Sequence, residues 1–230
     1  MTHEEPTPQT TSSLLSKGIT LSLTNVGKRY NREWIFRHLN FEFQTGKRYA
    51  ITGPNGAGKS TLLQVIGGAL MHNEGSIGYQ VAGSRTSEVL KTSEVSTSVP
   101  YQYVSIAAPY LELVEEMTAK EMLNFHAQFK SLGLPITEIL QAVGLADAAN
   151  KQLRYFSSGM KQRLKLAQAF FSDTPILLLD EPATNLDADG IALYRRLIND
   201  HTNNRLVIIS SNDKQEYDFC GEVVNIGDYK

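Results

Sequence analysis

One stretch decides the fold: Gly53-Pro54-Asn55-Gly56-Ala57-Gly58-Lys59-Ser60, which fits the phosphate-binding pattern G-x-x-x-x-G-K-[ST]. Its glycines let backbone N–H groups approach phosphate oxygens closely, and the start of a following helix adds its dipole. Lys59 is expected to reach the β- and γ-phosphates of a nucleotide, and Ser60 to bind Mg²⁺. We predict a phosphate site that continues to Thr61. The alternative is a glycine-rich turn with a chance lysine.

The segments on either side of this loop have the periodicity that the motif requires. The pattern predicts a strand at 48–52 before the loop and a helix at 59–70 after it, with Gly67 and Gly68 near the helix end. Upstream, apolar and polar residues alternate at 19–26 and 39–43, which predicts two further strands. Wholly apolar runs at 176–179 and 206–209 are typical of buried parallel strands.

The middle third of the chain has helical spacing. Thr118 and Glu121 predict a capping box that opens a helix. The apolar positions of that helix are Met122, Phe125, Phe129 and Leu132, and Gly133 with Pro135 is expected to end it. Further helices are expected at 136–143, 158–171 and 188–198, and a surface loop at 83–98.

An acidic pair follows the first of the two wholly apolar runs. Asp180 and Glu181 come directly after the buried strand, at a strand end that faces the phosphates in a phosphate-loop fold. Asp180 suits the Mg²⁺ shell, and Glu181 can orient or deprotonate an attacking water. An acidic turn without chemistry is the alternative.

A short Ser/Gly segment identifies the family that this order of motifs resembles. The run Phe156-Ser157-Ser158-Gly159-Met160 begins a predicted helix ahead of Asp180 and is similar to the signature motif LSGGQ of ABC ATPases. Ser157 and Gly159 match that motif directly, and the other three residues depart from it. The resemblance implies that Ser157, Ser158 and Gly159 bind the γ-phosphate of an ATP held by a partner subunit. An ordinary serine cap on the helix is the alternative.

Two further positions fit the same family. The run Asn185-Leu186-Asp187 lies where the family has its dimer-contact D-loop, although Asp187 could instead cap a helix. Tyr30 precedes Gly53 at a spacing where the family stacks an aromatic ring on adenine. A tyrosine of the core or the surface is the alternative for Tyr30.

Two positions depart from the family pattern. Where the family has a glutamine that contacts Mg²⁺, the corresponding position is Ala107, which has no ligand atom. Where it has a switch histidine after the second wholly apolar run, this sequence has Asn212. An asparagine can donate a hydrogen bond to phosphate but cannot titrate near neutral pH. Capping of a helix near Asp213 is the alternative for Asn212.

The resemblance implies an α/β fold: a P-loop NTPase core with a mostly parallel sheet, an N-terminal antiparallel β layer and an inserted helical subdomain at about 105–160. Residues 1–17 contain little that could offset the entropy of ordering, so a flexible tail is expected there. The rest, 18–230, is expected to be a single ABC ATPase domain without internal repeats.

The composition argues against several classes of protein. The 230 residues carry a net charge of −2, which gives no general attraction to nucleic acid or anionic lipid. The single cysteine, Cys220, fits a reducing compartment. No stretch approaches the roughly 18 to 20 apolar residues of a membrane helix, and no signal peptide is visible. We expect a cytoplasmic chain that a separate membrane subunit holds at the inner face of the membrane.

The resemblance therefore implies an ATP-binding and ATP-hydrolysing subunit of an ABC transporter, which uses ATP and Mg²⁺, pairs with a second copy and drives a transmembrane permease. An apolar cluster of Pro109, Tyr110, Leu111 and Leu113 is where the family receives a helix of that permease, unless these residues pack the subdomain's own core. Two other functions stay open. One is a regulatory nucleotide-binding module with very slow hydrolysis, and the other is a soluble ABC ATPase outside transport.

Overall fold

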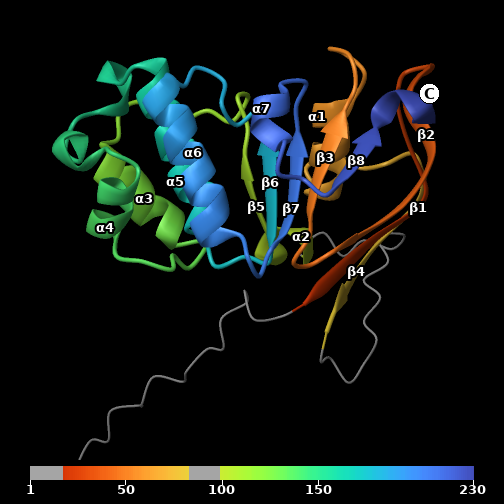
Figure 1. Ribbon diagram of the computed structural model, residues 1–230, viewed down its shortest axis with the longest axis horizontal. Helices are drawn as coiled ribbons and strands as arrows, with labels where there is room; N and C mark the ends of the chain where they lie inside the picture. The colour runs from red at the N-terminus through yellow and green to blue at the C-terminus, as the bar shows by residue number, and fades with distance from the viewer. Residues whose placement is uncertain (1–17, 83–98) are drawn as a thin grey trace, which may run out of the picture.

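The computed structural model describes residues 18–82 and 99–230, so the predicted tail at 1–17 and the loop expected at 83–98 lie outside the described residues. Three strands form an antiparallel sheet in the order β2-β1-β4. This sheet confirms the expected N-terminal β layer, which lies at one end of the molecule in Figure 1. Its strands are β1 (Ile19–Tyr30), β2 (Glu33–Gln44) and β4 (Glu74–Val81).

A second sheet of five strands has the order β5-β6-β7-β3-β8, and every described pairing within it is parallel. Parallel strands end at the same edge of a sheet, so the residues that follow them gather on one side of the molecule. The strands are β3 (Arg48–Thr52), β5 (Val104–Ala107), β6 (Ile176–Asp180), β7 (Leu206–Ser210) and β8 (Glu222–Asn225).

Most helices lie beyond the β5 edge of the parallel sheet, where α3, α4, α5 and α6 gather in Figure 1. The capping box of Thr118 and Glu121 at the start of α3 is confirmed. None of the helices in the described ranges is long and apolar enough to cross a membrane. The helices are α1 (Lys59–Ile66), α2 (Val99–Tyr103), α3 (Ala119–Ala127), α4 (Ile136–Ala142), α5 (Ser158–Phe170), α6 (Ala188–His201) and α7 (Lys214–Tyr217).

Several elements differ in length from the pattern-based prediction. β1 and β2 extend into one long hairpin, because cross-strand pairing continues through polar residues up to Tyr30 and Glu33. α1 ends four residues early, since Gly68 adopts a left-handed conformation and the Ala69 N–H donates back to the Gln64 carbonyl at 2.9 Å. α3 ends before Phe129, which follows a tight turn and is exposed, with its ring edge-on to that of Phe125 on α3.

The core lies on both faces of the parallel sheet. Leu177 and Leu179 of β6 point into the cluster formed with the helices α3 to α6. Ile176 and Leu178 of the same strand point into a second cluster, shared with α1 and the antiparallel sheet. Burial on both faces explains why β6 and β7 are apolar at every position except the last.

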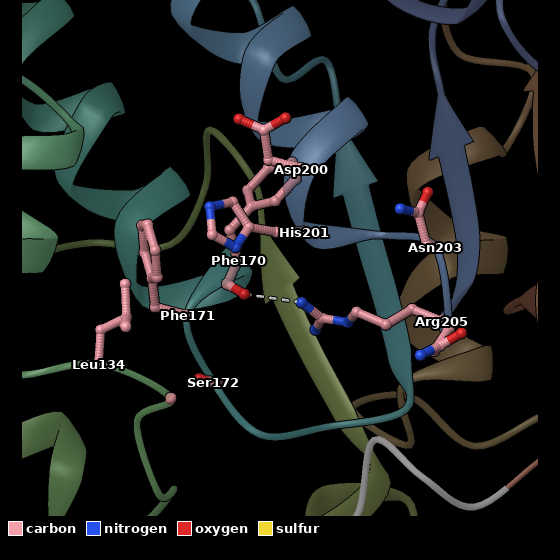
Figure 2. A pocket seen from close by; sticks show the side chains of 10 residues that line it. Leu134, Phe170, Phe171, Ser172, Asp200, His201, Asn203 and Arg205 are labelled. Atoms are coloured by element: carbon pink, nitrogen blue, oxygen red, sulfur yellow. Dashed lines mark hydrogen bonds between the residues drawn. The ribbon is translucent and has the colours of Figure 1, made fainter.

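Arg205 ties the amino end of β7 to the neighbouring elements (Figure 2). Its guanidinium donates to the carbonyl of Phe170 at the end of α5 (2.8 Å), and to the hydroxyls of Ser105 (2.7 Å) and Thr174 (2.9 Å). Burial lowers the pKa of Arg205 to about 9. The arginine lines a pocket of about 380 Å³ together with Phe171 and His201.

Replacing Arg205 with methionine should lower the free energy of unfolding by about 3 kcal/mol, because the buried Phe170 carbonyl and the Ser105 and Thr174 hydroxyls lose the hydrogen bonds that the guanidinium donates. The measurement is chemical denaturation. Arg195→Met is the matched control, since Arg195 is a partly exposed arginine paired with Asp218, and its loss should be under about 1 kcal/mol. Equal losses in the two variants would show that the Arg205 contacts contribute little.

Candidate functional site

The phosphate loop connects β3 to α1 and packs against the β1–β2 hairpin. Gly58 has a φ of 107°, and a Cβ atom there would lie 2.4 Å from Cγ2 of Ile35, so only glycine fits. The Lys59 ammonium donates to the carbonyls of Gly53 (2.8 Å) and Pro54 (3.3 Å). The loop therefore holds its lysine over its own backbone, with Asn55 and Gly56 exposed at its tip.

The remaining residues of the loop and the first turn of α1 anchor it. Ala57 is buried in the core cluster on the α1 side of the sheet. Ser60 and Thr61 follow Lys59 in the first turn of α1 and are half-buried. The first N–H groups of a helix lack partners within the helix, so this end of α1 can bind an anion.

Asp180 is the last residue of β6, and its side chain is only 2% exposed. Among the described residues, no donor lies within hydrogen-bonding distance of its Oδ1 atom. A buried carboxylate oxygen without a donor suits a cation, and Mg²⁺ prefers such oxygen ligands. Asp180 therefore fits the metal-binding role that the sequence predicts.

Glu181 begins the turn after β6 in a strained conformation. Its φ is 43°, in the left-handed region that residues other than glycine rarely adopt. The Glu181 N–H donates to the Ser210 carbonyl of β7 at 2.8 Å, and the Glu181 carbonyl accepts from Thr184 at 3.1 Å. These two hydrogen bonds hold the strained residue in place, and its side chain is half-buried at the same edge as the phosphate loop.

Asn212 joins the end of β7 to the phosphate loop. Its side-chain amide donates to Oδ1 of Asn55 at 2.9 Å. The alternative in which Asn212 caps the next helix is wrong, because the N-cap of α7 is Asp213, whose carboxylate accepts from the Gln215 N–H. The amide of Asn212 is therefore available to the loop.

The signature segment opens α5. Ser157 is the N-cap of this helix, and its hydroxyl accepts from the Met160 N–H at 3.2 Å, so the capping alternative is confirmed for this hydroxyl. Ser158 is exposed in the first turn. A Cβ atom on Gly159 would lie 3.0 Å from the carbonyl of Asn185, which keeps this position small.

Asp187 of the D-loop segment has a structural role within the chain. Its carboxylate accepts from the Gly190 N–H at 2.8 Å and caps α6, which confirms the capping alternative. It also pairs with Arg163 of α5 at 3.0 Å. The hydrogen bond from Gly190 is the main reason why the pKa of Asp187 lies below its usual range. The signature helix and the D-loop therefore form one connected unit.

Tyr30 lies at the tip of the β1–β2 hairpin and is 46% exposed. The Lys28 ammonium is 5.1 Å from the centre of its ring. Since Ile35 of the same hairpin touches Gly58, the tip that carries Tyr30 belongs to the structure around the phosphate loop. An exposed ring in this position can receive a flat aromatic ligand.

The sequence interpretation missed Glu216, a carboxylate of α7 that is only 4% exposed. Its Oε1 atom accepts from the Ala183 N–H at 2.7 Å, and so fixes the turn that follows Glu181. Burial raises the pKa of Glu216. No pattern marks this residue as functional, since only the folded chain brings α7 against the turn after β6.

Comparison with known sequences finds the ABC transporter family, which matches residues 36–184, more than half of the chain. The cytochrome c biogenesis ATP-binding export protein CcmA of Brucella abortus is 32% identical over 196 residues, covering 83% of this chain and 84% of that protein. The lantibiotic transport ATP-binding protein SrtF of Streptococcus pyogenes is 29% identical over 209 residues, covering 91% of this chain and 84% of that protein.

Solved structures show the same fold. A dimeric ATP-binding cassette in a post-hydrolysis state, bound to ADP and Pi, has a TM-score of 0.74 at 22% identity and covers 90% of this chain and 95% of that one. A bacterial Atm1-family ABC exporter with ATP bound has a TM-score of 0.75 at 21% identity and covers 91% of this chain and 38% of that one. These similarities confirm the predicted α/β architecture.

Replacing Lys59 with alanine should weaken nucleotide binding, because a hydrogen bond to a charged group contributes roughly 1.5 to 3 kcal/mol. Isothermal calorimetry with ATP and Mg²⁺ measures the loss. The control is Lys47→Ala, which removes an exposed lysine paired with Glu222 on the neighbouring strand β8. If both variants bind ATP as the unmodified protein does, the loop is not the phosphate site.

Proposed function

Because the chain belongs to the ABC transporter family and is an ATP-binding, ATP-hydrolysing subunit of such a transporter, we propose that its phosphate loop forms one half of a two-chain ATP site. One observation carries this proposal. Three neighbouring parallel strands lead into the candidate residues: β3 into the phosphate loop, β6 into Asp180-Glu181 and β7 into the segment that carries Asn212. The side chain of Asn212 is also hydrogen-bonded to Asn55 of the loop.

In this proposal the loop binds the phosphates of ATP. The backbone N–H groups of 53–61 and the Lys59 ammonium contact the phosphate oxygens, and Tyr30 stacks on the adenine. Ser60 and Asp180 would hold Mg²⁺, a role that the Asp180 oxygen without a donor supports. When bound, the metal neutralises charge on the phosphates.

Hydrolysis requires a water placed in line with the γ-phosphate. We assign the orientation and deprotonation of that water to Glu181, which the hydrogen bond to Ser210 and the support of Glu216 hold in one conformation. Asn212 would donate its amide hydrogen to the γ-phosphate, and its contact with Asn55 keeps it at the loop.

The second half of the site would come from another copy of the chain. The start of α5, at Ser157, Ser158 and Gly159, presents helix N–H groups that can bind an anion. In a head-to-tail pair with two-fold symmetry, each copy would offer this end to the γ-phosphate on the other copy. The dimeric cassette with ADP and Pi has the same fold and is consistent with such a pair.

A separate permease would carry the substrate and hold this chain at the inner face of the membrane. The names of the relatives CcmA and SrtF refer to export and transport. Of the apolar cluster expected to receive the permease, Leu113 packs against the core and Leu111 is half-buried, while Pro109 and Tyr110 are exposed. We therefore propose the exposed Tyr110 and the neighbouring exposed Val114 as the docking residues, with the half-buried Leu111 between them.

A module with very slow hydrolysis is the second candidate function, and the buried Ala107 favours it because it offers no polar atom to the site. The steady-state rate of ATP hydrolysis separates the two functions. Co-purification with a membrane protein separates both from a soluble ATPase outside transport.

Replacing Glu181 with glutamine should slow hydrolysis by a factor of about 100 or more, within the range that general base catalysis contributes. ATP-bound dimers should then accumulate, and size-exclusion chromatography with saturating ATP and Mg²⁺ measures them. Glu138→Gln, at an exposed position of α4, should hydrolyse ATP normally. A Glu181→Gln variant that remains monomeric under these conditions contradicts the two-chain site.

Replacing Asn212 with alanine should cut turnover tenfold or more, equivalent to about 1.4 kcal/mol of activation free energy. Because an amide does not titrate, the rate of the unmodified protein between about pH 6 and 8 should show no step from this position. The control is Asn203→Ala, at an exposed position before β7 on the opposite side of the sheet. Equal turnover in the two variants would remove Asn212 from the mechanism.

A further inference from the structure

The turn after β6 is held by three neighbouring elements. β7 accepts a hydrogen bond from the Glu181 N–H, and α7 accepts one from the Ala183 N–H. The third contact comes from α5, where the side-chain amide of Gln162 donates to the Pro182 carbonyl at 2.8 Å. Three consecutive residues of the turn are therefore each fixed by a different element.

The contact between Gln162 and Pro182 is buried. Gln162 is only 3% exposed, and Pro182 is buried as well. A buried carbonyl that loses its donor costs free energy, so the contact favours one position of the turn. The strained φ of Glu181 makes this restraint important, because a residue keeps such a conformation only where its surroundings hold it.

Gln162 also connects the turn to the signature segment. It follows Ser158 by one helical turn on α5, so the two residues lie on the same side of the helix. The next residue, Arg163, pairs with Asp187 of the D-loop segment. The signature helix therefore contacts the chain after β6 at two places, and the one made by Gln162 lies next to Glu181.

We propose that Gln162 is a positioning residue for ATP hydrolysis: by holding the Pro182 carbonyl, it keeps the Glu181 carboxylate of its own chain directed at the attacking water. Without this contact the turn can relax from its strained conformation, and the carboxylate moves with it. The inference rests on the proposed role of Glu181 in orienting and deprotonating that water.

The test is Gln162→Met, which keeps the length of the side chain and removes the donor. It is made in the unmodified chain and in the Glu181→Gln variant. In the unmodified chain, kcat should fall about tenfold while the affinity for ATP in calorimetry changes less than about threefold, since only the catalytic group is misplaced. In the Glu181→Gln variant, the residual rate should change less than about twofold, because the carboxylate through which Gln162 acts is gone.

Gln168→Met is the matched control, because Gln168 is a half-buried glutamine further along the same helix, and this variant should hydrolyse ATP normally. A purely structural role of Gln162 predicts the same fold loss in both backgrounds, and that result would overturn the inference. A Glu181→Gln variant that hydrolyses ATP at the normal rate would instead overturn the proposed function.

If Gln162→Met does not fold, Gln162→Asn replaces it. This variant keeps the amide and withdraws it from the Pro182 carbonyl by one methylene group. It should show the same dependence on Glu181, and a loss of equal size in both backgrounds would again overturn the inference.

Discussion

The register of the parallel strands is the constraint on which the site depends. Ile51 of β3 and Asp180 of β6 both pair with Ser210 of β7, so these three strands end level with one another. A shift of one residue would turn every side chain of a strand to the other face. It would move Asp180 out of its buried position and break the hydrogen bond between Glu181 and Ser210. The two core clusters, which fill opposite faces of the same strands, prevent such a shift.

Much of the fold could be predicted from the sequence, because its strongest signals are local. The phosphate loop, the apolar strands and the Thr118–Glu121 capping box each depend on neighbouring residues. The length of the β1–β2 hairpin could not be predicted, since cross-strand pairing overrides the polar residues near its tip. Of the site, Asp180 and Glu181 were predictable from their position after a buried strand. The supporting contact of Glu216 with Ala183 was not, because it joins residues distant in the sequence.

The two departures from the family pattern have different physical consequences. Asn212 provides a hydrogen-bond donor at the phosphate loop, but its amide cannot become positively charged near neutral pH. How strongly it binds a phosphate therefore depends only on the distance between the amide and the phosphate oxygen. Ala107 provides no donor, and its burial prevents any ligand contact. At these two positions the site therefore keeps a neutral donor after β7 and has no polar side chain at the end of β5.

The central claim is that each ATP site takes its loop from one chain and its signature segment from another. Mixing two inactive variants, Lys59→Ala and Ser158→Asp, tests it most directly. The second variant places a carboxylate at an exposed helix start, where a negative charge is tolerated by the helix but repels phosphate. Each variant alone should be inactive. An equal mixture, at a concentration where the unmodified protein is dimeric, should regain about a quarter of the normal activity, since random pairing yields one intact site in four. A mixture that stays inactive would contradict the two-chain site.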